Sequence, residues 1–165
     1  MKKRFSVRHL TAAAVIAALY AALSLLSNTL GLTFGPVQLR VSEALTLLPF
    51  LFPGATWGLF IGCIVTNIIS PYGMLDMIFG SLATLLAGFL TGKAPNRYLT
   101  VLPPVVCNML IVSAVIAWQE TGFSAAFGPL FGYHALTIGL GQAIVCCALG
   151  LPLLRLVEKK RLFER

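Results

Sequence analysis

Six apolar segments, separated by short connections, fill the chain from about residue 9 to residue 157. A helix needs about 20 apolar residues to cross the hydrocarbon core of a bilayer, and most of these segments approach that length. The chain is 58% hydrophobic and 10% charged, whereas soluble domains carry about 25% charged residues. We therefore predict an all-α membrane protein with a single domain, residues 1–165, and transmembrane helices at about 9–30, 41–52, 55–69, 74–90, 100–118 and 133–157.

The second of these segments, about residues 41–52, is too short to cross the hydrocarbon as a straight helix. It contains Pro49 and is followed by Pro53. Irregular or short backbone segments are tolerated at membrane depth where protein surrounds them. We expect this segment to be enclosed by other helices or to extend into Pro53.

Basic residues cluster at the two ends of the chain, and their positions indicate its orientation. Nine of the 12 lie before residue 9 or after residue 154, and Lys93 and Arg97 lie in one predicted loop. Basic flanks favour the cytoplasmic side of a membrane. Six spans with cytoplasmic termini put 11 of 12 basic residues inside, with Arg40 as the exception, whereas five or seven spans put a basic terminus outside. We predict a multi-pass protein of the bacterial cytoplasmic (inner) membrane, and no nucleic-acid partner.

Polar residues inside apolar segments are costly, so their positions point to a site. With this topology they gather near the outer ends of the helices and form a cup that opens to the outside. The set comprises Gln38, Arg40, Glu43, Asn67, Asp76, Gln119, Glu120, His134 and Gln142. Glu43 and Asp76 stand out because each lies among apolar neighbours. Two alternatives stay open: these are ordinary interfacial residues, and Arg40 pairs with Glu43 three positions away.

The sequence lacks the motifs of catalysis, metal binding and phosphate binding. It has no nucleophile–base pair, no H-E-x-x-H pattern and no glycine-rich phosphate loop. Its four cysteines lie inside apolar segments and are interpreted as packing residues. We expect no enzymatic activity, no metal and no cofactor, so any ATP must be used by another chain.

Small residues form stripes on two of the predicted helices. Gly54, Gly58 and Gly62 recur every four residues, which allows close helix contact. The first helix carries two neighbouring stripes of alanine, at positions 13, 17 and 21 and at positions 14, 18 and 22. These stripes serve either packing within the bundle or the docking of another membrane protein.

Three stretches of the sequence resemble the QueT family. The most specific is Phe34-Gly35-Pro36-Val37-Gln38-Leu39-Arg40-Val41-Ser42-Glu43-Ala44-Leu45-Thr46-Leu47-Leu48-Pro49. The others are Gly58-Leu59-Phe60-Ile61-Gly62-Cys63 with Asn67, and Asp76-Met77-Ile78-Phe79-Gly80-Ser81-Leu82-Ala83-Thr84-Leu85. Members of this family are substrate-binding S components of energy-coupling factor (ECF) transporters, thought to import queuosine precursors.

The resemblance implies a six-helix S-component bundle that captures a solute from outside. It implies as partners a transmembrane coupling subunit and two ATPase subunits, with transport by toppling of the S component in the membrane. In this family an alanine face on the first helix docks the coupling subunit. The matching residues here are Ala13, Ala14, Ala17 and Ala18.

The resemblance also implies a small-molecule substrate, a 7-deazaguanine such as the aminomethyl derivative, or queuine. A carboxylate accepts hydrogen bonds from the N1–H and the exocyclic amine of a guanine-like edge together. Glu43 and Asp76 are the candidates for that edge or for a cationic arm, with Arg40 in the same predicted site. Candidates for the carbonyl and ring nitrogens are Gln38, Asn67 and Gln142, and candidates for stacking, or alternatively for the membrane interface, are Phe34, Trp118 and Tyr133.

Two other functions remain open from the sequence. One is an S component for another vitamin. The other is a stand-alone, homo-oligomeric small transporter or channel, in which Gly54, Gly58 and Gly62 form the subunit contacts. Co-purification with ATPase and coupling subunits separates the S components from the oligomer.

Overall fold

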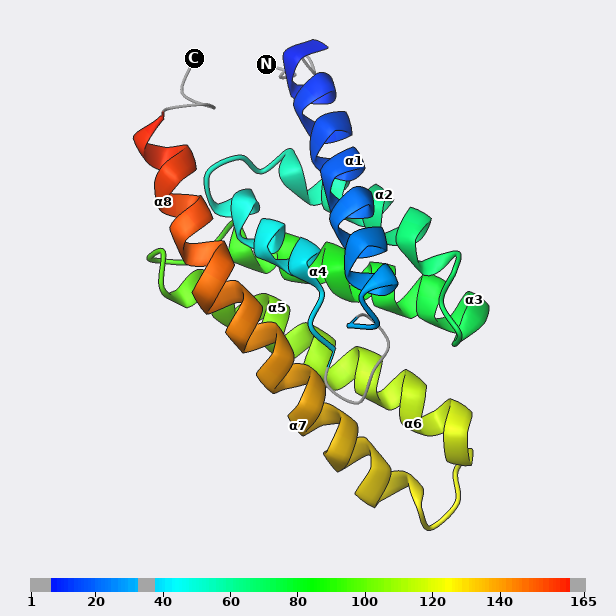
Figure 1. Cartoon of the computed structure of the whole chain (residues 1–165). Helices are drawn as coiled ribbons and strands as arrows, with labels where there is room; N and C mark the ends of the chain where they lie inside the picture. The colour runs from blue at the N-terminus through cyan, green and yellow to red at the C-terminus, as the bar shows by residue number, and fades with distance from the viewer. Residues whose placement is uncertain (1–6, 33–37, 161–165) are drawn as a thin grey trace, which may run out of the picture.

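The structure, a computed structural model, describes residues 7–32 and 38–160. These described residues are helical or lie in short connections, and they contain no strand (Figure 1). The predicted all-α class is therefore confirmed.

Six helical segments follow one another in the described residues, and three of them are built from several consecutive elements. The first three are α1 (Val7–Thr29), the 3₁₀-helix η1 (Val41–Phe50) and α2 (Ala55–Asn67). The fourth comprises α3 (Gly73–Leu75), η2 (Asp76–Gly80) and α4 (Ser81–Thr91). The fifth comprises η3 (Leu99–Val101), α5 (Leu102–Cys107), η4 (Asn108–Val112) and α6 (Ser113–Thr121). The sixth comprises α7 (Phe127–Val145), η5 (Cys146–Gly150) and α8 (Leu151–Lys159).

Four of these segments are long and apolar enough to cross a membrane: His9–Thr29, Gly73–Thr91, Leu99–Thr121 and Phe127–Lys159. The other two, η1 and α2, are shorter apolar helices. The start of α1 and the end of α8 lie at the same end of the bundle, and the connection between α6 and α7 lies at the other (Figure 1). This arrangement fits an even number of crossings, while six crossings remain a prediction.

The short second segment is enclosed by protein, as its length required. Every residue from Ser42 to Pro49 is buried. A 3₁₀-helix rises about 2.0 Å per residue, so ten residues cover about 20 Å, less than the roughly 30 Å of a hydrocarbon core. Runs of 3₁₀-helix beyond three or four residues are uncommon, so contacts with the surrounding helices must stabilise this one.

The fifth and sixth segments were predicted too short at the ends that face each other. Helix α6 continues to Thr121, and α7 begins at Phe127 rather than near Tyr133. Gly128, Pro129 and Gly132 made this stretch resemble a loop. Proline is tolerated in the first turn of a helix, where its missing N–H costs nothing.

The glycine stripe of α2 packs against α1 within the chain. A methyl group added to Gly62 would lie 2.8 Å from the carbonyl oxygen of Ala17, and one on Gly58 would collide with the carbonyl of Ala13. Glycine is therefore required for the close approach of these two helices. The stripe is covered by α1, which leaves Gly58 and Gly62 unavailable for contacts between subunits.

Each of the three long composite helices contains one turn of π-helix. These turns are η2, η4 and η5, and they begin at Asp76, Asn108 and Cys146. A π-turn inside an α-helix is rare and is frequent at functional sites, because it redirects side chains locally. All three first residues are buried.

Candidate ligand-binding site

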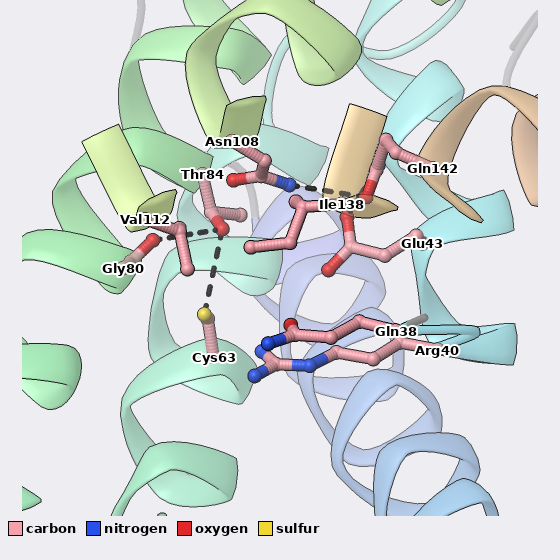
Figure 2. A pocket seen from close by; sticks show the side chains of 10 residues that line it. All are labelled: Gln38, Arg40, Glu43, Cys63, Gly80, Thr84, Asn108, Val112, Ile138 and Gln142. Carbon is pink, nitrogen blue, oxygen red and sulfur yellow. Dashed lines mark hydrogen bonds between the residues drawn. The ribbon is translucent and has the colours of Figure 1, made fainter. Parts of the chain in front are cut away.

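A small polar cavity lies inside the helix bundle (Figure 2). Its walls come from η1 and the residues before it, α2, η2, α4, η4 and α7. The lining residues are Gln38, Arg40, Glu43, Cys63, Gly80, Thr84, Asn108, Val112, Ile138 and Gln142. The centre of a water molecule can occupy about 20 Å³ of it, which is room for one water-sized group.

Glu43 is the buried carboxylate of this cavity, with 3% of its surface exposed. The hydroxyl of Tyr20 donates to its Oε1 at 2.5 Å, and Nε2 of Gln142 donates to its Oε2 at 2.9 Å. Burying a carboxylate is costly unless donors surround it. Tyr20 on α1 and Gln142 on α7 therefore each donate to one oxygen of the carboxylate on η1.

The amide of Gln142 extends this contact to the fifth helical segment. Nδ2 of Asn108, at the start of η4, donates to Oε1 of Gln142 at 3.2 Å. Gln142 and Asn108 are both buried. A continuous chain of hydrogen bonds therefore runs from α1 through η1 and α7 to η4.

A second polar cluster, around Arg40 and Asp76, adjoins the cavity. Nη2 of Arg40 lies 3.9 Å from Oδ2 of Asp76, and its Nη1 donates to Oδ1 of Asn67 at 3.4 Å. The hydroxyl of Ser70 donates to Oδ2 of Asp76 at 2.6 Å, and Nδ2 of Asn67 donates to the Asp76 carbonyl at 3.1 Å. The structure thus gives Arg40 an ion-pair partner 36 positions later in the chain, which spacing along a helix does not suggest.

The predicted polar residues divide into two groups. The first group lines the cavity and consists of Gln38, Arg40, Glu43 and Gln142. Asn67 and Asp76 do not line it, but both contact the guanidinium of Arg40. Away from the cavity, Gln119 donates to the Tyr72 carbonyl at 2.7 Å, and His134 lies 3.2 Å from Glu120. These last contacts join neighbouring helical segments near the surface.

The predicted aromatic residues do not line the cavity. Trp118 and Tyr133 are 41% and 50% exposed. The ring centroids of Trp118 and Phe123 lie 6.3 Å apart, and both residues line an apolar surface groove. The ring of Tyr133 packs beside that of His134. Phe34 lies outside the described residues.

Sequence reasoning missed Tyr20, Thr84 and Asn108, and treated Cys63 as a packing residue only. In the structure Cys63 accepts hydrogen bonds from Thr84 and Asn67 at the cavity wall. The signal for Asn108 was available, because an amide in the middle of an apolar span is costly and marks a functional position. No comparable signal marked Tyr20, since a tyrosine is an ordinary residue of a membrane helix.

The two alanine stripes of α1 have different environments. Ala13 and Ala17 are partly buried, and their carbonyls face the glycines of α2. Ala14 and Ala18 are exposed. Between α1 and α2 an apolar groove opens beside Ala14, and its lining also includes His9, Leu10, Trp57 and Ile61.

Comparisons with known proteins give a consistent result. The sequence model of a family described as the QueT transporter matches residues 10–159. A Lactococcus lactis subsp. cremoris (strain MG1363) protein described as "Queuosine precursor transporter QueT" is 36% identical over 72 residues. That alignment covers 44% of this chain and 42% of the relative, so less than half of the relative's length is matched. No solved structure matches the chain.

Proposed function

Because this chain belongs to the QueT transporter family, as the resemblance predicted, we propose that it captures a queuosine precursor for import. The chain is a multi-pass membrane protein, with four helices of membrane-spanning length and composition. We propose that its substrate is a 7-deazaguanine, such as the aminomethyl derivative or queuine. The relative named as a queuosine precursor transporter supports that class of substrate.

One observation carries this proposal: the buried carboxylate of Glu43 faces a polar cavity inside a membrane protein. Ionisable groups at membrane depth are expensive and mark substrate sites. The carboxylate is an acceptor for the N1–H and exocyclic amine of a guanine-like edge, and the guanidinium of Arg40 is a donor for the carbonyl. Acceptor and donor thus lie in the wall of the same cavity (Figure 2).

Substrate entry requires the cavity to expand. Its present volume of about 20 Å³ is far below the roughly 300–1,000 Å³ of drug-sized ligand pockets. The bond between Glu43 and Gln142 joins two residues that line the cavity, and an N–H group of the ligand can take the place of Gln142 on the carboxylate. We propose that the substrate displaces Nε2 of Gln142 from Glu43, while Oε1 of Gln142 keeps its bond to Asn108.

We further propose that the chain works as the S component of an ECF transporter in the bacterial inner membrane. In this arrangement the partner subunits hydrolyse ATP, and this chain catalyses no reaction and needs no cofactor. The exposed stripe of Ala14 and Ala18, beside the apolar groove between α1 and α2, is the proposed docking face. Small side chains there permit the close approach of a partner helix.

The orientation of the chain has its own test. We propose that both termini face the cytoplasm and that the connection between α6 and α7 faces outward. In a cysteine-free background, a cysteine introduced at Ser124 should react with a membrane-impermeant reagent in intact cells, whereas one at Asn96 should not. The reverse pattern would overturn the orientation and the outward opening of the site.

A binding screen on the purified protein tests the proposed function. We expect saturable calorimetric binding of 7-deazaguanines, weaker binding of guanine, and none of unrelated vitamins. Preferential binding of another vitamin would move the chain to a different substrate class. Recovery of only further copies of itself in co-purification would favour a stand-alone oligomer, although the packing of Gly58 and Gly62 against α1 argues against that assembly.

A further inference from the structure

The hydrogen-bond chain through Glu43 has a fixed direction. A carboxylate only accepts, so both Tyr20 and Gln142 must donate to it. Gln142 therefore directs its NH₂ group to Glu43 and its carbonyl to Asn108. The amide orientation of Gln142 follows from the chemistry of its neighbour.

The same logic sets the orientation of Asn108. Its Nδ2 donates to Oε1 of Gln142 at 3.2 Å. Figure 2 shows the amide nitrogen of Asn108 directed to Gln142 and the amide oxygen directed away from it. Asn108 lines the cavity and is 8% exposed, so a ligand there can meet its carbonyl oxygen or the second N–H of its NH₂ group.

Charge divides the cavity wall into two sides. Arg40 contributes donors only, and its guanidinium pairs with Asp76 beside the cavity. Glu43 contributes acceptors only, and the oriented Asn108 adds a neutral acceptor from η4. An edge of the ligand that carries N–H groups therefore matches the Glu43–Asn108 side, and an edge with a carbonyl matches the Arg40 side.

We propose that Asn108 is a specificity-determining ligand contact, whose Oδ1 accepts a hydrogen bond from an N–H of a planar heterocycle. Gln142 is the positioning residue that keeps the Asn108 amide in this orientation. The inference rests on the proposed function, since it places the ligand in this cavity. A base that carries an acceptor in place of that N–H places its lone pair against the lone pair of the Asn108 carbonyl oxygen. The two acceptors repel each other, so this base binds more weakly.

A purely structural role for Asn108 makes a different prediction. Amides also link helices inside membranes through hydrogen bonds. In that case, replacement of Asn108 changes the stability of the bundle and leaves the discrimination between ligands unaltered. Discrimination is therefore the measurement that separates the two roles.

The experiment compares wild type, Asn108→Leu and Asn108→Ala by calorimetry. The ligands are aminomethyl-7-deazaguanine, its analogue without the 2-amino group, and its analogue with a methyl group on N9. For the parent base, we expect either Asn108 variant to bind about tenfold more weakly, the loss from one buried hydrogen bond. The analogue without the 2-amino group lacks an N–H on the edge that matches the Glu43–Asn108 side, so its affinity should be nearly the same in wild type and in the variants. The N9-methyl analogue keeps that edge, so the Asn108 variants should weaken its binding as they weaken that of the parent base.

The matched control is Gln119→Leu, which removes an amide that bonds to Tyr72 away from the cavity and leaves the amides of the cavity in place. It should retain the wild-type preference between the ligands. Asn108→Ala, which adds no volume, answers the question if the leucine variant does not fold. Equal affinity of wild type and a folded Asn108 variant for the parent base, or an unchanged preference between the ligands, would overturn the inference alone. A wild-type protein that binds no deazaguanine would overturn the proposed function and the inference with it.

Discussion

The two buried carboxylates of the bundle, Glu43 and Asp76, are held in different ways. Asp76 has a cation, Arg40, at 3.9 Å and a hydroxyl donor, Ser70, at 2.6 Å. Glu43 has two neutral donors, Tyr20 and Gln142. Asp76 thus has a cation within 4 Å, whereas the hydrogen bonds to the carboxylate of Glu43 come from neutral groups, and Glu43 lines the cavity.

We propose that this difference separates a structural carboxylate from a ligand-binding one. Sequence reasoning treated Glu43 and Asp76 as equal candidates, because both interrupt apolar stretches. We propose Glu43 as the direct ligand contact, because it lines the cavity, and Asp76 as the residue that positions Arg40. Each of the following predictions tests one side of this comparison.

The largest effect on stability is expected for Asp76→Asn. The change leaves the Arg40 guanidinium, which is buried, without its carboxylate partner, and loss of one member of a buried ion pair is strongly destabilising. We expect the free energy of unfolding in detergent to fall by about 3 kcal/mol, the lower end of the usual range, because the ion pair is long at 3.9 Å. The control is Glu120→Gln, which removes an exposed pair with His134 and should cost about 0–1 kcal/mol. Equal losses of unfolding free energy in the two variants would contradict a structural role for Asp76.

The largest effect on ligand affinity is expected for Glu43→Gln. The variant keeps the volume of the side chain and loses the charged acceptor. Calorimetry should give a loss of about 1.5–3 kcal/mol in binding free energy for a 7-deazaguanine, the range for a hydrogen bond to a charged group. A folded Glu43→Gln protein with wild-type affinity would contradict the assignment of Glu43 as a ligand contact.

A smaller effect is expected for Tyr20→Phe. The change removes one hydroxyl that donates to Glu43, so the carboxylate is less well held for the ligand. We expect a loss of about 1 kcal/mol in binding free energy. Tyr98→Phe, which removes an exposed hydroxyl that accepts from Arg155, is the control and should leave binding unchanged. A larger loss in Tyr20→Phe than in Glu43→Gln would reverse the proposed order of importance.

No effect on ligand affinity is expected for Ala14→Trp. Ala14 is exposed on α1, about 120° around the helix from Tyr20, and a bulky residue there obstructs a partner helix. Uptake and recovery of the coupling subunit should be lost while calorimetric affinity is retained. Leu19→Trp is the control, because Leu19 is also exposed but lies about 140° around the helix from Ala14. An Ala14→Trp protein that still assembles and transports would exclude this stripe as the docking face.

Much of the fold could be predicted from the sequence because lipid imposes simple rules. Apolar length located all six helical segments, and the shortness of residues 41–52 correctly required enclosure by protein. The errors fell between Gln119 and Gly132, where glycine and proline at the start of α7 resembled a loop. A proline in a first helical turn and a proline in a loop look alike in sequence.

The candidate site could be predicted only in part. The cost of burying polar groups identified Glu43, Arg40 and Gln142, which line one cavity. The partners of these residues depend on which helices touch, and spacing along one helix gives no information on that. Hence the contact of Arg40 with Asp76 and the donation from Tyr20 to Glu43 required the structure. The two alanine stripes likewise differ only through the glycines of α2 that cover one of them.

The most direct test of ligand capture at Glu43 is an experimental structure of the protein with aminomethyl-7-deazaguanine bound. We expect the base in the cavity between Glu43, Asn108 and Arg40, with the bond between Gln142 and Glu43 replaced by bonds from the ligand. A base bound in the apolar groove beside Trp118, with Glu43 still bonded to Tyr20 and Gln142, would contradict it.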